Sequence, residues 1–149
     1  MNGLLGVDYG HRRLGLAAGD AAGIVATALR TVPVRSVDDA VAAVVAACAE
    51  TEAEGVVIGL PLNMNGTRGP MARQVEAFAE RLRGRLDIPV ELWDERLSSS
   101  LVERTLLDAD LSRRKRKAVR DKLAAQVILQ SFLDARAQPG MGGEGEVWA

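Results

Sequence analysis

The feature that most constrains the fold is a change in the spacing of apolar residues near position 36. Before it, short apolar runs at residues 4–7, 14–18 and 23–34 are separated by glycine-containing turns, which is typical of an antiparallel strand meander. After it, apolar residues recur on one helical stripe: Val37, Val41, Val44, Val45 and Cys48. A chain that begins as a meander and then changes to helical spacing predicts a mixed sheet with helices packed on it.

Strands and helices alternate along the rest of the chain. A β-branched run at 56–58 predicts a buried strand, and residues 88–93 predict a fifth strand. Helices are expected over 71–86 and 113–137, with a short helix between them that begins at Ser100. We therefore predict an α/β fold with one mixed five-stranded sheet and helices on both faces. The predicted domain spans residues 1–137, and the Gly-rich residues 138–149 are expected to form a disordered tail.

The composition excludes several kinds of chemistry. A length of 149 residues suits one domain, and Cys48 and His11 are the single cysteine and the single histidine. An intrachain disulfide, a cysteine-based zinc site and an HExxH metalloprotease are therefore excluded. The longest apolar run, residues 40–49, is about half of the roughly 20 residues that a membrane helix needs. With no signal peptide expected either, we predict a cytoplasmic protein without a membrane partner.

Basic residues are concentrated in one segment, although the whole chain has a net charge of −1. Residues 113–122 contain seven basic residues and one acidic residue. These basic residues could simply be the solvated start of a helix. However, basic side chains in a first helical turn oppose the helix dipole. A surface that contacts nucleic acid is the better interpretation. Its candidate residues are Arg113, Arg114, Lys115, Arg116, Lys117 and Lys122.

Carboxylates occur at three places where a cleft at the end of the sheet could bring them together. Asp8 ends the first strand, and Asp94 and Glu95 end the fifth, where strand alternation sends them to opposite faces. Asp121 falls on the apolar stripe of the last helix, one turn before Ala125. The structural alternatives are a turn cap, a solvated strand end and an ion pair within the helix.

Two loops offer donors for an anion. Residues 10–15 have the glycine spacing of a P-loop but lack its Lys and Ser/Thr, which argues against a Walker-type NTPase. Arg12 and Arg13 in this turn could contact phosphate or simply be solvated. Residues 59–70 form an unusually long connection after a buried strand, where ligands bind in open α/β sheets. The candidate donors of this second loop are Asn63, Asn65, Thr67 and Arg68.

Clustered carboxylates repel one another unless cations lie between them. Mg²⁺ or Mn²⁺ bound by carboxylate oxygens would relieve this repulsion. Two such ions about 4 Å apart can activate water and stabilise the leaving oxygen of a phosphodiester. A metal-dependent nuclease, with acids holding metal and basic residues holding the nucleic-acid backbone, is therefore the leading hypothesis.

Four segments resemble the motif blocks of the YqgF/RuvX family. They are DYGHRRLGLA from Asp8, GLPLNMNGT from Gly59, DERLSS from Asp94 and DKLAAQVILQ from Asp121, and the resemblance extends over residues 3–136. It implies an RNase H-like fold with strand order 3-2-1-4-5. It also implies a cytoplasmic nuclease, described both as a Holliday junction resolvase and as a processor of the 5′ end of pre-16S rRNA.

The resemblance also implies which acids hold metal: Asp8, Glu95 and Asp121. Asn65 stands where the family commonly has Asp, which puts an acidic role at that position in doubt. His11 and Ser99 also depart from the usual residues. RNA and DNA both remain open as substrates. A homodimer is also open, because symmetric cutting of two strands would suit a two-fold axis.

Two other hypotheses remain at this point. One is a non-catalytic nucleic-acid-binding module that keeps the basic helix and uses no metal. The other is an ATPase-like phosphate-binding domain, since Asp8 and Gly10 on a hairpin also resemble the phosphate loop of actin and sugar kinases. Those proteins close two such domains around the nucleotide, and this chain has the length of one.

Overall fold

The computed structural model describes residues 3–97 and 113–137, and only the backbone is described over 113–122. The elements are β1 (Leu5–Tyr9), β2 (Arg13–Gly19), β3 (Ala26–Pro33), α1 (Val37–Thr51), β4 (Val56–Leu60), α2 (Pro70–Arg83), β5 (Val90–Asp94), η1 (Glu95–Leu97) and α4 (Arg113–Ala137). The short helix and the tail expected at Ser100 and at 138–149 lie outside the described residues. No helix in the described part of the chain is long and apolar enough to cross a membrane.

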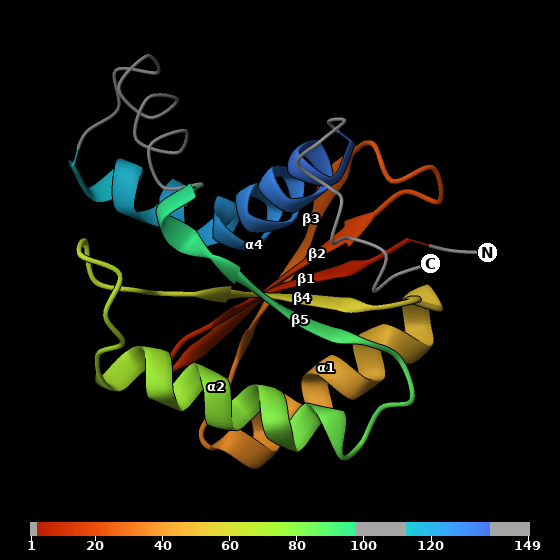
Figure 1. Cartoon of the computed structure of the whole chain (residues 1–149), viewed down its shortest axis with the longest axis horizontal. Coiled ribbons are helices and arrows are strands. Elements are labelled where there is room, and N and C mark those ends of the chain that lie inside the picture. Colours follow the sequence, from red (N-terminus) through yellow and green to blue (C-terminus); the bar gives the residue numbers. More distant parts are fainter. Residues whose placement is uncertain (1–2, 98–112, 138–149) are drawn as a thin grey trace.

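The five strands form one sheet in the order β3-β2-β1-β4-β5, which confirms the expected order (Figure 1). The meander supplies the antiparallel pairs β1/β2 and β2/β3, while β1/β4 and β4/β5 are parallel. Three parallel neighbours therefore end at the same edge of the sheet, and this edge carries Asp8, Gly59 and Asp94.

Helices cover both faces of the sheet, with α1 and α2 on one side and α4 on the other (Figure 1). Strand alternation divides the core accordingly. Leu5 and Val7 of β1 pack in the cluster under α1 and α2, so Gly6 and Asp8 face α4. The cluster under α4 is smaller and consists of Leu4, Ala17, Ala26, Val57, Ala125, Ile128, Leu129, Phe132 and Leu133.

Small residues allow α4 to lie directly on the sheet. A Cβ at Gly6 would stand 2.7 Å from the Cβ of Leu129 and 3.0 Å from the carbonyl oxygen of Ala125. Trp93 of β5 ties the helix to the opposite edge, because its indole N–H donates to the Ser131 hydroxyl at 3.0 Å. The ring of Trp93 also packs edge-on against Phe132. The close packing over Gly6 and the contacts of Trp93 thus hold α4 on the sheet at two places.

The side chain of Ser36 caps the start of α1. The Ser36 hydroxyl accepts from the Asp39 N–H at 3.1 Å, which satisfies one of the free donors of the first turn. The Asp39 carboxylate accepts from the N–H of Arg35, one residue before the cap. Asp39 therefore bonds the N–H of the residue before the cap, whereas the Glu of a capping box bonds the N–H of the cap residue itself.

Several element boundaries differ from the sequence prediction. The third strand begins at Ala26 rather than at 23, because the Asp20 carboxylate accepts from the N–H groups of Ile24 and Val25 and holds them in the turn. The fifth strand covers Val90–Asp94 rather than 88–93. Helix α2 ends at Arg83, before the expected end at 86, because Gly84 follows it.

Candidate active site

Asp8 lies near the carboxyl end of the central strand β1, opposite Gly15 of β2. It is partly buried and follows Gly6 on the face that α4 covers. The β1/β4 register pairs Val7 with Ile58, so the next residues, Asp8 and Gly59, come side by side. A carboxylate at the centre of the sheet is thus aimed at the space under α4 rather than at the hairpin surface.

Glu95 approaches Asp8 from β5, on the far side of β4. It is the first residue of η1, and its Cγ and Cδ lie 2.9 and 3.1 Å from where a Cβ at Gly59 would stand. Ile128 of α4 closes the same space from above, at 2.5 Å from that position. A side chain at 59 would therefore displace Glu95, and the glycine gives the carboxylate its path across β4 toward β1.

The Glu95 carboxyl is in an environment that disfavours its charge. Burial, together with the negative charges of Asp8 and Asp94, raises its pKa to about 7. Near neutral pH the Glu95 carboxyl is therefore close to the point at which it loses its proton. A cation between Glu95 and Asp8 would favour the charged form of both groups, which is the behaviour expected of metal-binding carboxylates.

Asp94 is paired with Arg96 instead. Arg96 donates to its carboxylate from Nε and Nη2, with the shortest distance at 2.6 Å. These hydrogen bonds lower the pKa of Asp94, opposite to the shift of its neighbour Glu95. The two acids therefore separate as strand alternation predicts, with Glu95 beside Asp8 and Asp94 paired to Arg96.

The position of Asp121 is known from the backbone of α4. The apolar stripe to which the sequence assigns it is confirmed where it is described, since Ala125, Ile128 and Phe132 are buried. Ala125 lies over Gly6, so the preceding helical turn runs toward the carboxyl end of β1. The side chain of Asp121 lies outside the described residues. Within the described ranges, no group of three His, Cys, Asp or Glu side chains could hold a metal ion.

A hollow of about 190 Å³ adjoins Asp8 on the side of the meander. Arg12 and Arg13 are exposed at its wall, and His11 and Thr31 complete it together with glycine backbone. The predicted phosphate contacts from this turn thus lie beside the carboxylate at the end of β1. Cationic guanidinium groups next to the acids are what a phosphodiester substrate requires.

The polar side chains of the long loop after β4 also bond within the protein, and their predicted contact with an anion stays a prediction. Asn63 donates to the Thr67 hydroxyl at 2.9 Å, and that hydroxyl and the Thr67 N–H both donate to Asn65 Oδ1. Arg68 pairs with Glu76 of α2 at 2.8 Å. The groups expected to receive an anion are therefore bonded to one another or to α2, because the loop needs them to hold its shape.

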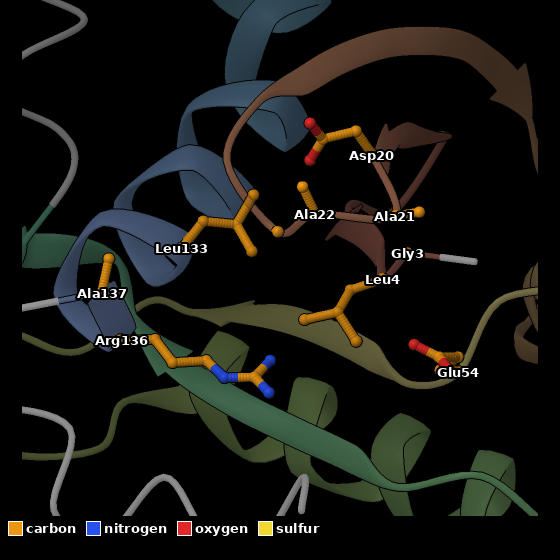
Figure 2. Close-up of a pocket in the computed structure, with 10 residues that line it drawn as sticks. Gly3, Leu4, Asp20, Ala21, Ala22, Glu54, Leu133, Arg136 and Ala137 are labelled. Atoms are coloured by element: carbon orange, nitrogen blue, oxygen red, sulfur yellow. The ribbon is translucent and has the colours of Figure 1, made fainter. Parts of the chain in front are cut away.

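A second hollow, of about 260 Å³, lies at the opposite end of the sheet under the last turns of α4. Figure 2 shows Leu4 and Leu133 within it, and Asp20, Glu54 and Arg136 around it. The carboxylate of Asp20 accepts hydrogen bonds from backbone N–H groups, which lower its pKa. This hollow is larger than the one beside Asp8, but the pKa of its Asp20 is lowered, whereas that of Glu95 is raised.

Comparisons with known proteins agree with this arrangement. The RuvX family model, described as Holliday junction resolvase, matches residues 2–135. The chain belongs to the RuvX family.

Curated relatives of this RuvX protein are similar over nearly their whole length. One from Symbiobacterium thermophilum is 47% identical over 132 residues, covering 89% of this chain and 92% of the relative. One from Geobacillus kaustophilus is 46% identical over 134 residues, covering 89% and 97%. Both are provisionally named pre-16S rRNA nucleases.

Solved structures show the same fold at much lower sequence identity. Thermus thermophilus RuvC aligns with a TM-score of 0.53 at 16% identity, covering 89% of this chain and 95% of RuvC. RuvC in complex with a Holliday junction substrate aligns with a TM-score of 0.51 at 17% identity, covering 89% and 94%. The RuvX chain therefore has the RNase H-like fold that its sequence predicts.

Sequence reasoning missed two residues that shape the RuvX site. It identifies Gly59 only as the end of a strand, and it gives Arg96 no role. Arg96 pairs with Asp94 and also donates from Nη1 to the Met64 carbonyl oxygen at 3.2 Å, so it connects η1 to the β4–α2 loop. The sequence offered one signal for this pair: Asp94 and Arg96 have opposite charges and flank Glu95.

The basic segment can be placed only in part. Its residues form the first turns of α4, which confirms a helix beginning at Arg113. Figure 1 shows these turns at the same end of the molecule as η1 and the β4–α2 loop. The side chains of Arg113, Arg114, Lys115, Arg116, Lys117 and Lys122 lie outside the described residues, and their contact with nucleic acid stays a prediction.

Proposed function

We propose that this RuvX protein is a divalent-metal-dependent nuclease that hydrolyses phosphodiester bonds in structured nucleic acid. The observation that carries the proposal is the Glu95 carboxyl, partly buried beside Asp8 with its pKa raised to about 7. A side chain that served the fold alone would be better replaced by a neutral one at this place. Strongly perturbed carboxylates of this kind are typical of catalytic sites.

Asp8 and Glu95 are the residues that would hold Mg²⁺ or Mn²⁺, with Asp121 as the proposed third ligand. Carboxylate oxygens are the preferred donors for these ions. When bound in a pair, such ions activate water and stabilise the leaving oxygen of a phosphodiester. The protein's own contribution is to fix Glu95 over Gly59 and to exclude water from one side of it with Ile128.

Basic side chains would hold the substrate backbone. Arg12 and Arg13 at the hollow beside Asp8 suit a phosphate next to the scissile one. The basic first turns of α4 would extend this contact along the strand. Because the polar groups of Asn63, Asn65 and Thr67 are bonded within their loop, we assign them a structural role in supporting the site.

Two structured substrates fit the proposal. The names of the curated relatives favour the 16S rRNA precursor, and the family description favours four-way junction DNA. Maturation of the rRNA precursor would take place in the cytoplasm. The proposed contacts are compatible with either substrate, since both carry phosphate groups and phosphate contacts carry no sequence information.

A side-by-side cleavage assay tests the proposal. Purified wild-type protein is incubated with a precursor rRNA fragment and with a four-way DNA junction, each with Mg²⁺, Mn²⁺ or EDTA. We expect metal-dependent cleavage of at least one substrate and its loss in Asp8→Asn, with binding retained. Binding without cleavage under every divalent ion would instead support a non-catalytic nucleic-acid-binding module.

The basic segment has its own test. Replacement of Arg114, Lys115 and Lys117 by Ala is expected to reduce the slope of log affinity against log salt by about 0.7–0.9 for each phosphate that the helix no longer neutralises. Affinities are measured by fluorescence anisotropy between roughly 50 and 200 mM salt, the range over which phosphate neutralisation changes affinity strongly. An unchanged slope would remove this helix from the binding surface.

A further inference from the structure

The most exposed large apolar side chain in the described part of the molecule belongs to Met64, which is 92% exposed. It lies in the β4–α2 loop, which follows the strand that carries Gly59. Scattered apolar residues are common on protein surfaces. Met64 differs because its loop is held by hydrogen bonds and because that loop borders the site.

Hydrogen bonds within the loop fix the backbone on both sides of Met64. The Asn63 N–H donates to the Thr67 carbonyl oxygen at 2.9 Å, and the Gly66 N–H donates to the Asn63 carbonyl oxygen at 2.8 Å. Gly66 closes the turn in the left-handed region with a φ of 87°. The thioether is therefore presented to solvent by a tight turn rather than by a loose segment.

Arg96 connects this turn to the carboxylates. One of its nitrogens donates to the Met64 carbonyl oxygen, and two others bind Asp94. Because Arg96 directly follows Glu95, the position of Met64 is coupled to that of the acid. Leu97, the next residue of η1, is 59% exposed, so a second apolar side chain follows on the same short element.

We propose that Met64 is a positioning residue that packs on the face of an unstacked base next to the scissile phosphate. This inference rests on the proposed nuclease function and specifies which feature of structured nucleic acid is recognised. A junction or the end of a helix leaves one base face uncovered, and a polarizable thioether packs well on an aromatic face. Apolar side chains that enter between bases are a known means of holding distorted nucleic acid.

This role explains why a folded protein keeps a well-placed apolar side chain in water. Met64 is not among the apolar residues packed against either core cluster of the described structure, so its replacement should leave the fold intact. Its contact with a base would also complement the arginines beside Asp8. Arg12 and Arg13 would bind phosphate charge under the proposed function, whereas Met64 would select substrates with an accessible base.

The experiment compares Met64→Ala and Met64→Leu with Ile24→Ala. Ile24 is a matched control, because it is 64% exposed in the β2–β3 turn at the other end of the sheet. All three are made with and without Asp8→Asn, so that binding can be measured in the presence of Mn²⁺ without cleavage. The probes are a four-way junction and an rRNA hairpin, each with 2-aminopurine at the branch point or helix end.

We expect Met64→Ala to weaken binding of the probe about five- to tenfold, at the low end of the range for stacking on a full aromatic ring. The 2-aminopurine signal of base unstacking should fall with it, while the salt dependence stays that of the wild type. Met64→Leu should restore most of both, and Ile24→Ala should match the wild type.

Equal binding and equal fluorescence for Met64→Ala and the wild type would overturn the inference, as would an equal loss in Ile24→Ala. Failure of the nuclease proposal would look different. In that case the wild type would cleave no substrate with any metal, while the binding and fluorescence comparison of the Met64 variants would still give its own result.

Discussion

The two ends of the sheet under α4 differ in what their hollows contain. The hollow beside the amino end of β1 is the larger, at about 260 Å³ against about 190 Å³ beside Asp8. One of its two acids, Asp20, is exposed and accepts hydrogen bonds from backbone N–H groups, which lower its pKa. At the other end Glu95 is partly buried beside Asp8 and its pKa is raised. The state of the carboxylates, rather than the volume of the hollow, distinguishes a candidate catalytic end from a structural one.

The same contrast appears between neighbours in the chain. Asp94 and Glu95 are adjacent in sequence, yet the pKa of one is lowered by Arg96 and that of the other is raised by burial. An acid that is stabilised by its own partners serves the fold. An acid whose charge is destabilised until a cation arrives is available for chemistry.

The largest expected effect is on cleavage. We expect Glu95→Gln to lower metal-dependent cleavage by more than about a hundredfold, because even outer-shell partners of metal ligands cost about 10–100-fold. Asp20→Asn, at the other end of the sheet, should cleave at the wild-type rate. Single-turnover rates with saturating Mn²⁺ measure both. Equal losses in the two variants would abolish the distinction between the ends.

The second largest effect concerns how the free energy of unfolding depends on pH, measured in EDTA. The pKa of Glu95 is raised from 4.5 to about 7 in the folded protein. The cost of burying its ionised form is therefore absent near pH 4, and it destabilises the fold as pH rises toward 7. Glu95→Gln should therefore exceed the wild type by up to about 3 kcal/mol in free energy of unfolding at pH 8, and match it near pH 4. Urea unfolding at the two pH values measures this difference.

Asp20→Asn should show the opposite dependence. The folded pKa of Asp20 is lowered, so its contribution to stability is present above the unfolded pKa and disappears as pH falls. The variant should be less stable than the wild type at pH 7 and equal to it at strongly acidic pH. A gain in stability at neutral pH would contradict the structural role given to Asp20.

The third effect comes from closing the gap over β4. Gly59→Ala would place a methyl group 2.5 Å from Ile128 and 2.9 Å from Glu95, and overpacking of this kind costs typically about 1–3 kcal/mol. We also expect cleavage to fall, since Glu95 must move. Gly84→Ala is the matched control, because its methyl group would meet nothing nearer than 3.5 Å. Thermal unfolding and the cleavage rate of both variants test the difference.

The smallest effect concerns one arginine at each hollow. Arg12→Ala should weaken nucleic-acid binding several-fold and reduce the salt slope by about 1, whereas Arg136→Ala should change neither. Anisotropy titrations at several salt concentrations measure both quantities. If Arg136→Ala weakened binding as much, the nucleic acid would extend over both ends of the sheet.

Much of the fold could be predicted because local patterns determine it. The helical stripe through Val41 and Val44, the β-branched run at 56–58 and the apolar stripe through Ala125 and Ile128 each report a burial preference that tertiary packing did not override. At the third strand the prediction was wrong because a side chain bonded backbone groups outside the local pattern. The third strand starts late because Asp20 binds the N–H groups of residues 24 and 25.

The candidate site was predictable in its acids and less so in their surroundings. Asp8 and Glu95 stand out in the sequence because carboxylates end apolar strands. The donor role given to Asn63 and Thr67 did not anticipate that the loop would use these groups itself. The tie from Arg96 to the Met64 backbone joins segments 32 residues apart, and no local pattern reports such a contact.

The sequence by itself determined which residues form strands and helices, which of their faces are apolar, and which carboxylates stand at strand ends. These properties follow from chain periodicity and side-chain solubility, both of which are local. The family resemblance already names Glu95 rather than Asp94. Only the tertiary structure decided that Gly59 makes room for Glu95 beside Asp8 and that Met64 is held outward. These outcomes depend on distances between segments far apart in the chain, and packing alone sets those distances.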